Sequence, residues 1–200
     1  MVEGATEKVF KPHLLEFLRP RFKGPMPRLV FRTYDGRIPK GEKLRQVVRH
    51  SLSGKNAADG VIALTDVYTG GATRDFTGAA DAKAKMTAWV GKEETRFYPH
   101  VALHDFEAWL LPYWPTIQRL AGHNTAAPAG NPEAVNHEKP PAYRIKEIFE
   151  TGRCRDSYVK PRDAGRILKG NDLLTAVNAC AELKALVNSI LSICGGQKIS

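Results

Sequence analysis

The sequence has few cysteines and no long apolar run. Its three cysteines, Cys154, Cys180 and Cys194, lie far apart, so they provide neither a disulfide framework nor a zinc-type CxxC pair. Apolar stretches are interrupted within a few residues, which argues against a membrane-spanning helix. No basic and then apolar leader opens the chain, so we expect no secretory signal. These absences favour a single soluble domain in the reducing cytoplasm.

The standard nucleotide-binding motifs are also missing. The loop at Gly70-Gly71 lacks the lysine of a P-loop, and GxGxxG does not occur. No Ser-His-Asp or Cys-His spacing stands out. A nucleotide-handling phosphotransferase is therefore the least supported of the enzyme classes that we consider.

Positive charge is in excess and unevenly distributed. The formal net charge is +9, from 30 Lys and Arg against 21 Asp and Glu. Residues 19–55 contain two acidic residues and eleven basic ones: Arg19, Arg21, Lys23, Arg28, Arg32, Arg37, Lys40, Lys43, Arg45, Arg49 and Lys55. Such a surface attracts polyanions and releases their counterions on contact. The pattern favours nucleic-acid binding, with an ordinary solvated face as the alternative.

Strand-like and helix-like segments alternate over the first two-thirds of the chain. The apolar pattern predicts helices over 6–18, 42–52, 79–90 and from 106 to 111, where Pro112 and Pro115 break the last one. It predicts strands over 28–34, 60–65 and 98–103. This order is typical of an α/β fold with a small parallel, Rossmann-like sheet flanked by helices. We place this core at residues 1–120.

The rest of the chain, residues 121–200, is predicted to be a loop followed by a helical extension packed on the core. Residues 121–141 are rich in Ala, Gly, Asn and Pro, which favours a loop. Helices are expected over 142–149, 161–168 and 173–193. The apolar stripe of the last helix would pack on the sheet or on a second copy, so a homodimer is permitted.

Carboxylates stand where the predicted parallel strands end. Asp66 follows the strand 60–65, and Asp105 and Glu107 follow the strand 98–103 together with His104. Glu3 lies in the turn before the first helix. Functional groups of parallel sheets gather at these carboxyl ends, and converging carboxylates suit a hard divalent cation that can hold a scissile phosphate. Helix capping is the structural alternative for each of them.

Several motifs in order resemble those of a known family. VEGATE, ALTDVY, FYPHVALHDFEAWL and NPEAVN, between Val2 and about Leu168, are similar to the motifs of a bacterial Toprim-like family, domain of unknown function four-two-seven-six. The Toprim fold is shared with topoisomerases, primases and OLD-type nucleases. The resemblance implies a Mg²⁺- or Mn²⁺-dependent nuclease of a bacterial defence-type system, with an ATPase partner.

The resemblance also assigns roles to residues. Glu3 matches the Toprim glutamate, an acid–base or metal-linked group, and Asp66 matches the first aspartate of the metal pair. His104 and Glu107 match the HEFEA histidine and second glutamate, with Asp105 in place of the first glutamate. Tyr68 stands where a Toprim domain has its second Asp, so Asp105 or Glu107 would replace that ligand. Relatives have an apolar strand before VEG, whereas two residues precede Glu3 here. Either the start codon is assigned too late, or this first strand is missing or truncated.

The leading hypothesis is a metal-dependent phosphodiesterase acting on DNA or RNA. Its catalytic residues would be Glu3 and His104, its metal ligands Glu3, Asp66, Asp105 and Glu107, and its phosphate-binding residues Arg32, Lys43, Arg45, Arg49, Lys160 and Arg162. The alternative is a catalytically silent module that binds nucleic acid or a partner ATPase. The NPE motif, with Asn136 and His137, is either a turn or a lid over the substrate.

Overall fold

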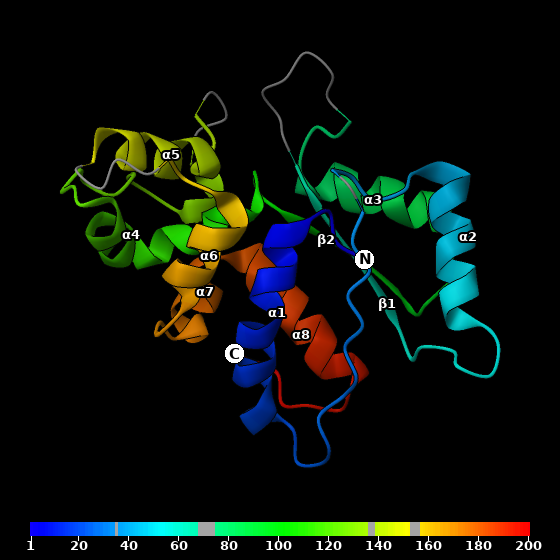
Figure 1. Ribbon diagram of the computed structural model, residues 1–200. Coiled ribbons are helices and arrows are strands. Elements are labelled where there is room, and N and C mark those ends of the chain that lie inside the picture. Colours follow the sequence, from blue (N-terminus) through cyan, green and yellow to red (C-terminus); the bar gives the residue numbers. More distant parts are fainter. Residues whose placement is uncertain (35, 68–74, 136–138, 153–156) are drawn as a thin grey trace.

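The chain folds into a mixed α/β structure with a two-stranded parallel sheet flanked by helices (Figure 1). The structure is a computed structural model that describes residues 1–34, 36–67, 75–135, 139–152 and 157–200. Tyr68, Asn136, His137 and Cys154 therefore lie outside the described residues. The fold class predicted from the sequence is confirmed at this level, as α/β with a small parallel sheet.

The sheet consists of β1 (Val61–Asp66) and β2 (Phe97–Ala102). They pair in parallel from Val61 opposite Phe97 to Asp66 opposite Ala102. The crossover contains α3 (Ala79–Val90), whose bounds are those predicted. Because the strands are parallel and in register, the residues that follow both of them meet at one edge of the sheet.

The first two residues extend the sheet beyond β1. The Met1 amine donates to the Ile62 oxygen at 2.7 Å, and Val2 forms an isolated parallel bridge with Thr33. The predicted strand 28–34 is wrong apart from that bridge at Thr33. The reason is that strands need partners along their length, and only Met1 and Val2 lie between this segment and β1.

Helices cover the sheet on both sides (Figure 1). α2 (Gly41–Leu52) packs with α3 on one side, and their apolar faces form a core with the strands. α1 (Ala5–Leu18) and α8 (Ala181–Ile193) lie on the other side. A larger core joins α1 with residues as far along as Leu191, so it takes residues from both parts of the chain that the sequence analysis separated.

Proline positions shape the segment after β2. A 3₁₀ helix, η2 (Phe106–Tyr113), contains Pro112, and α4 (Trp114–Ala121) begins immediately after it. The prediction that Pro112 ends the helical segment is wrong. Pro115 lies in the first turn of α4, where its missing N–H leaves no hydrogen bond unmade. A shorter 3₁₀ helix, η1 (Arg19–Arg21), follows α1 and contains Pro20.

The C-terminal part is helical, as predicted, but its last helix is broken. It contains η3 (Pro132–Ala134), α5 (Pro141–Thr151), α6 (Lys160–Leu168), α7 (Leu173–Ala179) and α8. The single helix predicted over 173–193 is wrong, because Cys180 is extended and α7 and α8 meet at 115°. In the described ranges no single helix is long and apolar enough to cross a membrane. Taken together, α7 and α8 have the length and composition of a membrane-spanning helix, but the chain is sharply bent between them.

Candidate functional site

Five carboxylates gather at the carboxyl ends of the strands. We call Glu3, Glu7, Asp66, Asp105 and Glu107 the acidic cluster. Burial raises the pKa of Asp66 well above its ordinary value, and the charges of the other four raise it further. The other three metal ligands predicted from the sequence, Glu3, Asp105 and Glu107, are therefore each close enough to Asp66 to raise its pKa, and so is Glu7.

Glu3 and Glu7 enter the cluster from the start of the chain. The Thr65 hydroxyl donates to Glu3 Oε1, and the backbone N–H of Gly4 donates to Glu7 Oε2 at 3.1 Å. Burial raises the pKa of Glu3 to about 7, against the effect of the Thr65 hydrogen bond, and the charge of Glu7 raises it further. Glu7 is 5% exposed, which is unusual for a residue that would only favour a helix start.

Asp105 and Glu107 are the most deeply buried members. Asp105 is fully buried, and its Oδ2 accepts from the backbone N–H of Ala142 at 3.1 Å. Its Oδ1 has no hydrogen-bond partner in the described part of the chain. Burial, together with the charge of Glu107, raises the pKa of Asp105 to about 7. An unpaired buried oxygen of this kind is costly, so it marks a place where a cation or donor would be favourable.

Two residues of the C-terminal part bond to Glu107, and one of them carries a positive charge. The Tyr158 hydroxyl donates to Glu107 Oε1 at 3.2 Å, and Lys160 Nζ donates to Oε2 at 3.1 Å. Burial lowers the pKa of Lys160, but Glu107 and Asp105 outweigh this and leave it above its ordinary value. The predicted phosphate ligand Lys160 is thus brought to the acidic cluster, although it already has an ionic partner there.

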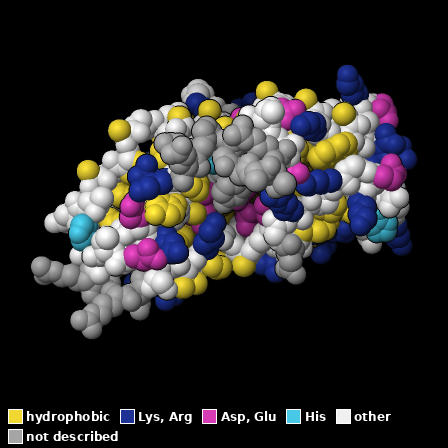
Figure 2. All heavy atoms as spheres, turned by 90° about the horizontal axis from the view of Figure 1, so that it is seen from above, with side chains coloured by type: hydrophobic (Ala, Val, Ile, Leu, Met, Phe, Trp, Pro, Cys, Tyr) yellow, Lys and Arg dark blue, Asp and Glu magenta, His cyan; other side chains and the backbone are white. Residues whose placement is uncertain are grey.

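A cavity of about 240 Å³ opens beside the cluster. Its lining includes Glu3, Asp66 and Lys160, together with Arg37, Lys40 and Asp75, which the sequence analysis had not chosen. Both of these cations pair with Asp75, Lys40 at 2.6 Å. Figure 2 shows acidic side chains in the middle of this face with Lys and Arg side chains around them. The sequence contained a signal for Arg37 and Lys40, because both follow the segment 28–34, which ends at the same edge of the sheet as β1 and β2.

The other predicted basic residues lie elsewhere. Arg32, Lys43, Arg45 and Arg49 are not among the residues that line this cavity, and Arg45 bonds the Val90 oxygen at 3.2 Å. Arg162 donates two hydrogen bonds to Asp163, at 3.0 and 2.9 Å. Of the six residues predicted to bind phosphate, the structure therefore places only Lys160 in the lining of the cavity.

His104 and the NPE motif have structural partners. His104 is buried with Nδ1 3.3 Å from the Val67 oxygen. Glu133 of the NPE motif accepts hydrogen bonds from the Glu182 N–H and from Trp109 Nε1. Asn131 Oδ1 accepts from the Glu133 N–H at 2.8 Å. These contacts favour the turn rather than the lid, since Glu133 holds the start of α8 against η2.

No group of three or more His, Cys, Asp or Glu side chains in the described part of the chain is arranged to hold a metal ion. The acidic cluster nevertheless consists of oxygen donors, which are the ligands that Mg²⁺ and Mn²⁺ prefer. Mg²⁺ commonly binds through one or two carboxylates, with water and substrate phosphate completing its shell.

The fold and site define a class: an α/β domain with an acidic cluster at the carboxyl end of a parallel sheet. The chain belongs to the family described as "Domain of unknown function (DUF4276)", which matches residues 2–191. The family of unknown function named from the motifs is thereby confirmed, and the match reaches further toward the C-terminus than those motifs do. Its relationship to Toprim and OLD-type nucleases stays a prediction. No curated protein and no solved structure matches the chain.

Proposed function

We propose that this protein is a divalent-metal-dependent phosphodiesterase that cleaves nucleic acid. The observation that carries the proposal is the crowding of four carboxylates around Asp66 at the end of the sheet. Carboxylates held this close are stable only when protonated or when a cation lies among them. The net charge of +9 adds a general attraction for polyanions, and the VEG and strand-end Asp motifs are similar to those of Toprim nucleases.

Asp66 and Asp105 are the residues that would hold Mg²⁺ or Mn²⁺. Both carry raised pKa values, caused first by burial and then by neighbouring acids. Oδ1 of Asp105 is buried without a partner in the described residues, so a cation would supply the interaction that it lacks. When bound, the metal neutralises phosphate charge and makes water a better nucleophile.

The remaining side chains position the substrate and the proton. Arg37, Lys40 and Lys160 line the cavity that contains Glu3 and Asp66, so a phosphodiester entering it would meet three cations beside the acidic cluster. Glu3 accepts the hydroxyl hydrogen of Thr65 in the same lining. In this proposal Glu3 would accept a proton from the attacking water, because it lines the same cavity as Asp66. His104, bonded to the Val67 oxygen, has no assigned step.

The test is cleavage of plasmid DNA, single-stranded DNA and RNA with Mg²⁺ or Mn²⁺ against EDTA. Asp66→Asn should lower cleavage by roughly 100-fold or more, because it removes a charge on which the site depends. Asp81→Asn is the matched control, since Asp81 pairs with Lys85 on α3 and should leave activity unchanged. Cleavage that survives EDTA, or survives Asp66→Asn, contradicts the proposal.

A second candidate function is a binding module without catalysis, for nucleic acid or a partner ATPase. The ion pair between Lys160 and Glu107 favours it, because Lys160 supplies within the chain the positive charge that a metal would otherwise bring. Calorimetric titration with Mg²⁺ and Mn²⁺ separates the two candidates. Tight DNA binding with no heat of metal binding would select the module, whereas metal binding that Asp66→Asn abolishes would select the enzyme.

A further inference from the structure

Part of the lining of the cavity beside the acidic cluster is apolar. Ile38, Phe76 and Trp89 contribute to it, together with the charged residues already described. Trp89 belongs to α3, and Phe76 lies in the segment just before that helix. A metal ion and a phosphate both need polar partners, so the proposed cleavage leaves this part of the lining unused. We call Ile38, Phe76 and Trp89 the apolar wall.

Trp89 supplies a ring that is only partly covered. It packs against the core beside Phe76, with the two ring centroids 6.1 Å apart and the planes tilted by 45°. Phe76 is buried, whereas Trp89 is half-buried. The other two tryptophans, Trp109 and Trp114, are 1% and 5% exposed. Of the three tryptophans, Trp89 is therefore the one that can present ring surface to a ligand.

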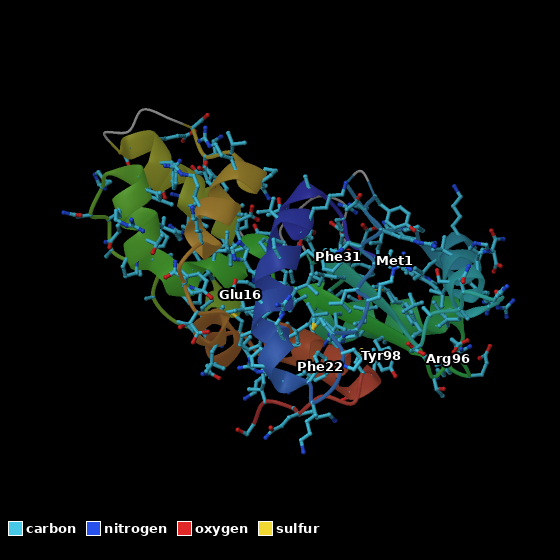
Figure 3. All side chains as sticks on the ribbon, turned by 60° about the horizontal axis from the view of Figure 1, so that its bottom comes forward. Met1, Glu16, Phe22, Phe31, Arg96 and Tyr98 are labelled. Carbon is cyan, nitrogen blue, oxygen red and sulfur yellow. The ribbon has the colours of Figure 1, made fainter. Side chains whose placement is uncertain are left out.

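Aromatic side chains beside α1 are not part of this wall. Figure 3 shows Phe22 and Phe31 next to that helix, and Lys11 Nζ of α1 lies 5.6 Å from the centroid of the Phe31 ring. Neither phenylalanine lines the cavity beside the acidic cluster. The aromatic part of the lining therefore comes from the α3 side of the sheet, and Phe31 offers a control position outside the cavity.

Positive charge lies next to the apolar wall. Arg37 and Lys40 both pair with Asp75, Lys40 at 2.6 Å, so two cations share one carboxylate. Ile38 lies between the two cations in the sequence, and Phe76 directly follows Asp75. Consecutive Cα atoms are about 3.8 Å apart, so the cations and the wall are immediate neighbours. A ligand held by the cations would also contact the wall.

A flat base joined to a phosphate is the ligand that suits both partners. Arg and Lys side chains bind phosphate oxygens. Bases stack on aromatic side chains in proteins that bind single-stranded nucleic acid, and every base has a π face with which to do so. The net charge of +9 favours a polyanion as the molecule that carries this base and phosphate.

The volume of the cavity limits how much of a nucleic acid can enter. Pockets for drug-sized ligands are typically about 300–1,000 Å³, whereas this cavity has about 240 Å³. That is room for one base and its phosphate, but not for a base pair with its two backbones. We propose that the cavity binds one unpaired nucleotide of a single strand, with its phosphate at Arg37 and Lys40 and its base on Trp89. The assignment rests on the proposed function and names its substrate class.

The test is binding of deoxyadenosine 5′-monophosphate to the full chain, with and without Mg²⁺. This nucleotide has no phosphodiester bond, so its binding is measured independently of cleavage. Isothermal titration calorimetry should give a Kd of about 1 mM or tighter. Deoxyribose 5-phosphate, which lacks the base, should bind about 10-fold more weakly. Equal binding of the two compounds, or no binding of the nucleotide, overturns the proposal.

Tryptophan fluorescence reports where the base lies. The nucleotide should quench the emission of the wild type, because Trp89 is the accessible tryptophan. Trp89→Phe keeps an aromatic ring, so it should bind the nucleotide within about 3-fold of the wild type but lose the quenching. Quenching that persists in Trp89→Phe would place the base elsewhere and overturn the proposal.

A leucine variant separates stacking from apolar packing. Trp89→Leu removes the ring, so it should weaken nucleotide binding about 10-fold and leave the binding of deoxyribose 5-phosphate unchanged. Phe31→Leu is the matched change outside the cavity and should leave both unchanged. Circular dichroism first checks that each variant folds, and Trp89→Phe decides if Trp89→Leu does not. Nucleotide binding by Trp89→Leu that equals the wild type contradicts stacking on Trp89.

Competition tests the preference for a single strand. A deoxyadenosine oligonucleotide with a phosphorothioate backbone, which resists cleavage, should displace the bound nucleotide, whereas the same strand in a duplex should not. Displacement by the duplex at the same concentration overturns the single-strand assignment. Binding that depends on Trp89, without any metal-dependent cleavage, would contradict the phosphodiesterase and support the nucleotide site. Cleavage by a protein that binds both small compounds equally would do the reverse.

Discussion

Lys160 Nζ lies 3.1 Å from Glu107 Oε2, and this ion pair joins α6 to η2 inside the acidic cluster. Glu107 is 1% exposed, so its charge depends on the partners that the C-terminal part supplies. The helical extension is therefore part of the site, because it carries both Lys160 and the Tyr158 hydroxyl.

Replacing Lys160 should destabilise the protein and increase its response to metal. Lys160→Gln leaves the buried Glu107 carboxylate without its cation, which costs roughly 1–3 kcal/mol in the free energy of unfolding once the partial exposure of Lys160 is allowed for. Urea denaturation measures this change. Lys146→Gln, which breaks an exposed pair with Glu150, should cost less than about 0.5 kcal/mol.

Metal should compensate for that loss if the acidic cluster binds it. Mg²⁺ or Mn²⁺ should raise the melting temperature of Lys160→Gln more than that of the wild type, because the variant has one cation fewer among its acids. Thermal unfolding with and without EDTA measures the difference. An equal shift in both proteins would show that the metal binds away from Lys160.

His100 should make stability depend on acid pH. Burial, and then the charge of Lys83, lower the pKa of His100 from 6.5 to about 4, so the folded protein favours the neutral ring. This stability is complete above about pH 6.5 and is lost as the pH falls toward 4, by roughly 3 kcal/mol in total. Denaturation curves between pH 7 and 4 measure the loss.

The matching variant is His100→Gln, which can keep the hydrogen bond to Ser189 but does not titrate. Over the same pH range it should lose roughly 3 kcal/mol less than the wild type. His50→Gln, at an exposed position near the end of α2, should follow the wild-type curve. Parallel curves for wild type and His100→Gln would mean that His100 titrates normally.

Glu133 should be essential for stability rather than for binding. Its two oxygens accept from the Glu182 N–H at 3.1 and 3.0 Å, and Oε1 also accepts from Trp109 Nε1 at 3.2 Å. Glu133→Ala should cost about 2–3 kcal/mol, and Glu133→Gln about 1 kcal/mol, because Gln keeps one acceptor. Chemical denaturation gives both values. Glu147→Gln, at a largely exposed ion pair, is the control and should be nearly neutral.

Asp163 should likewise hold α6 in place. Its fully buried carboxylate accepts from the Val159 N–H at 2.8 Å and pairs with Arg162 and Arg166. Asp163→Asn should lower the free energy of unfolding by roughly 2 kcal/mol, since it removes the charge that both arginines share. Urea denaturation measures this loss. A change below 0.5 kcal/mol would show that Asp163 does not hold α6 in place.

Local chemistry determined most of the elements. The bounds of α1, α2, α3, β1 and β2 agree with the apolar periodicities to within a residue. The order of motifs identified the family, and the rule for parallel strands placed Asp66, Asp105 and Glu107 at one edge. These properties depend on neighbours within a few positions, so the sequence alone carries them.

Long-range contacts decided the rest. The segment 28–34 has strand composition but only Met1 and Val2 as partners, and the apolar stripe over 173–193 breaks at Cys180, where Glu133 holds the start of α8. The pairing of Lys160 with Glu107 joins residues 53 positions apart. A sequence pattern records which side chains are apolar or charged, whereas only the packed chain determines which groups remain available to pair.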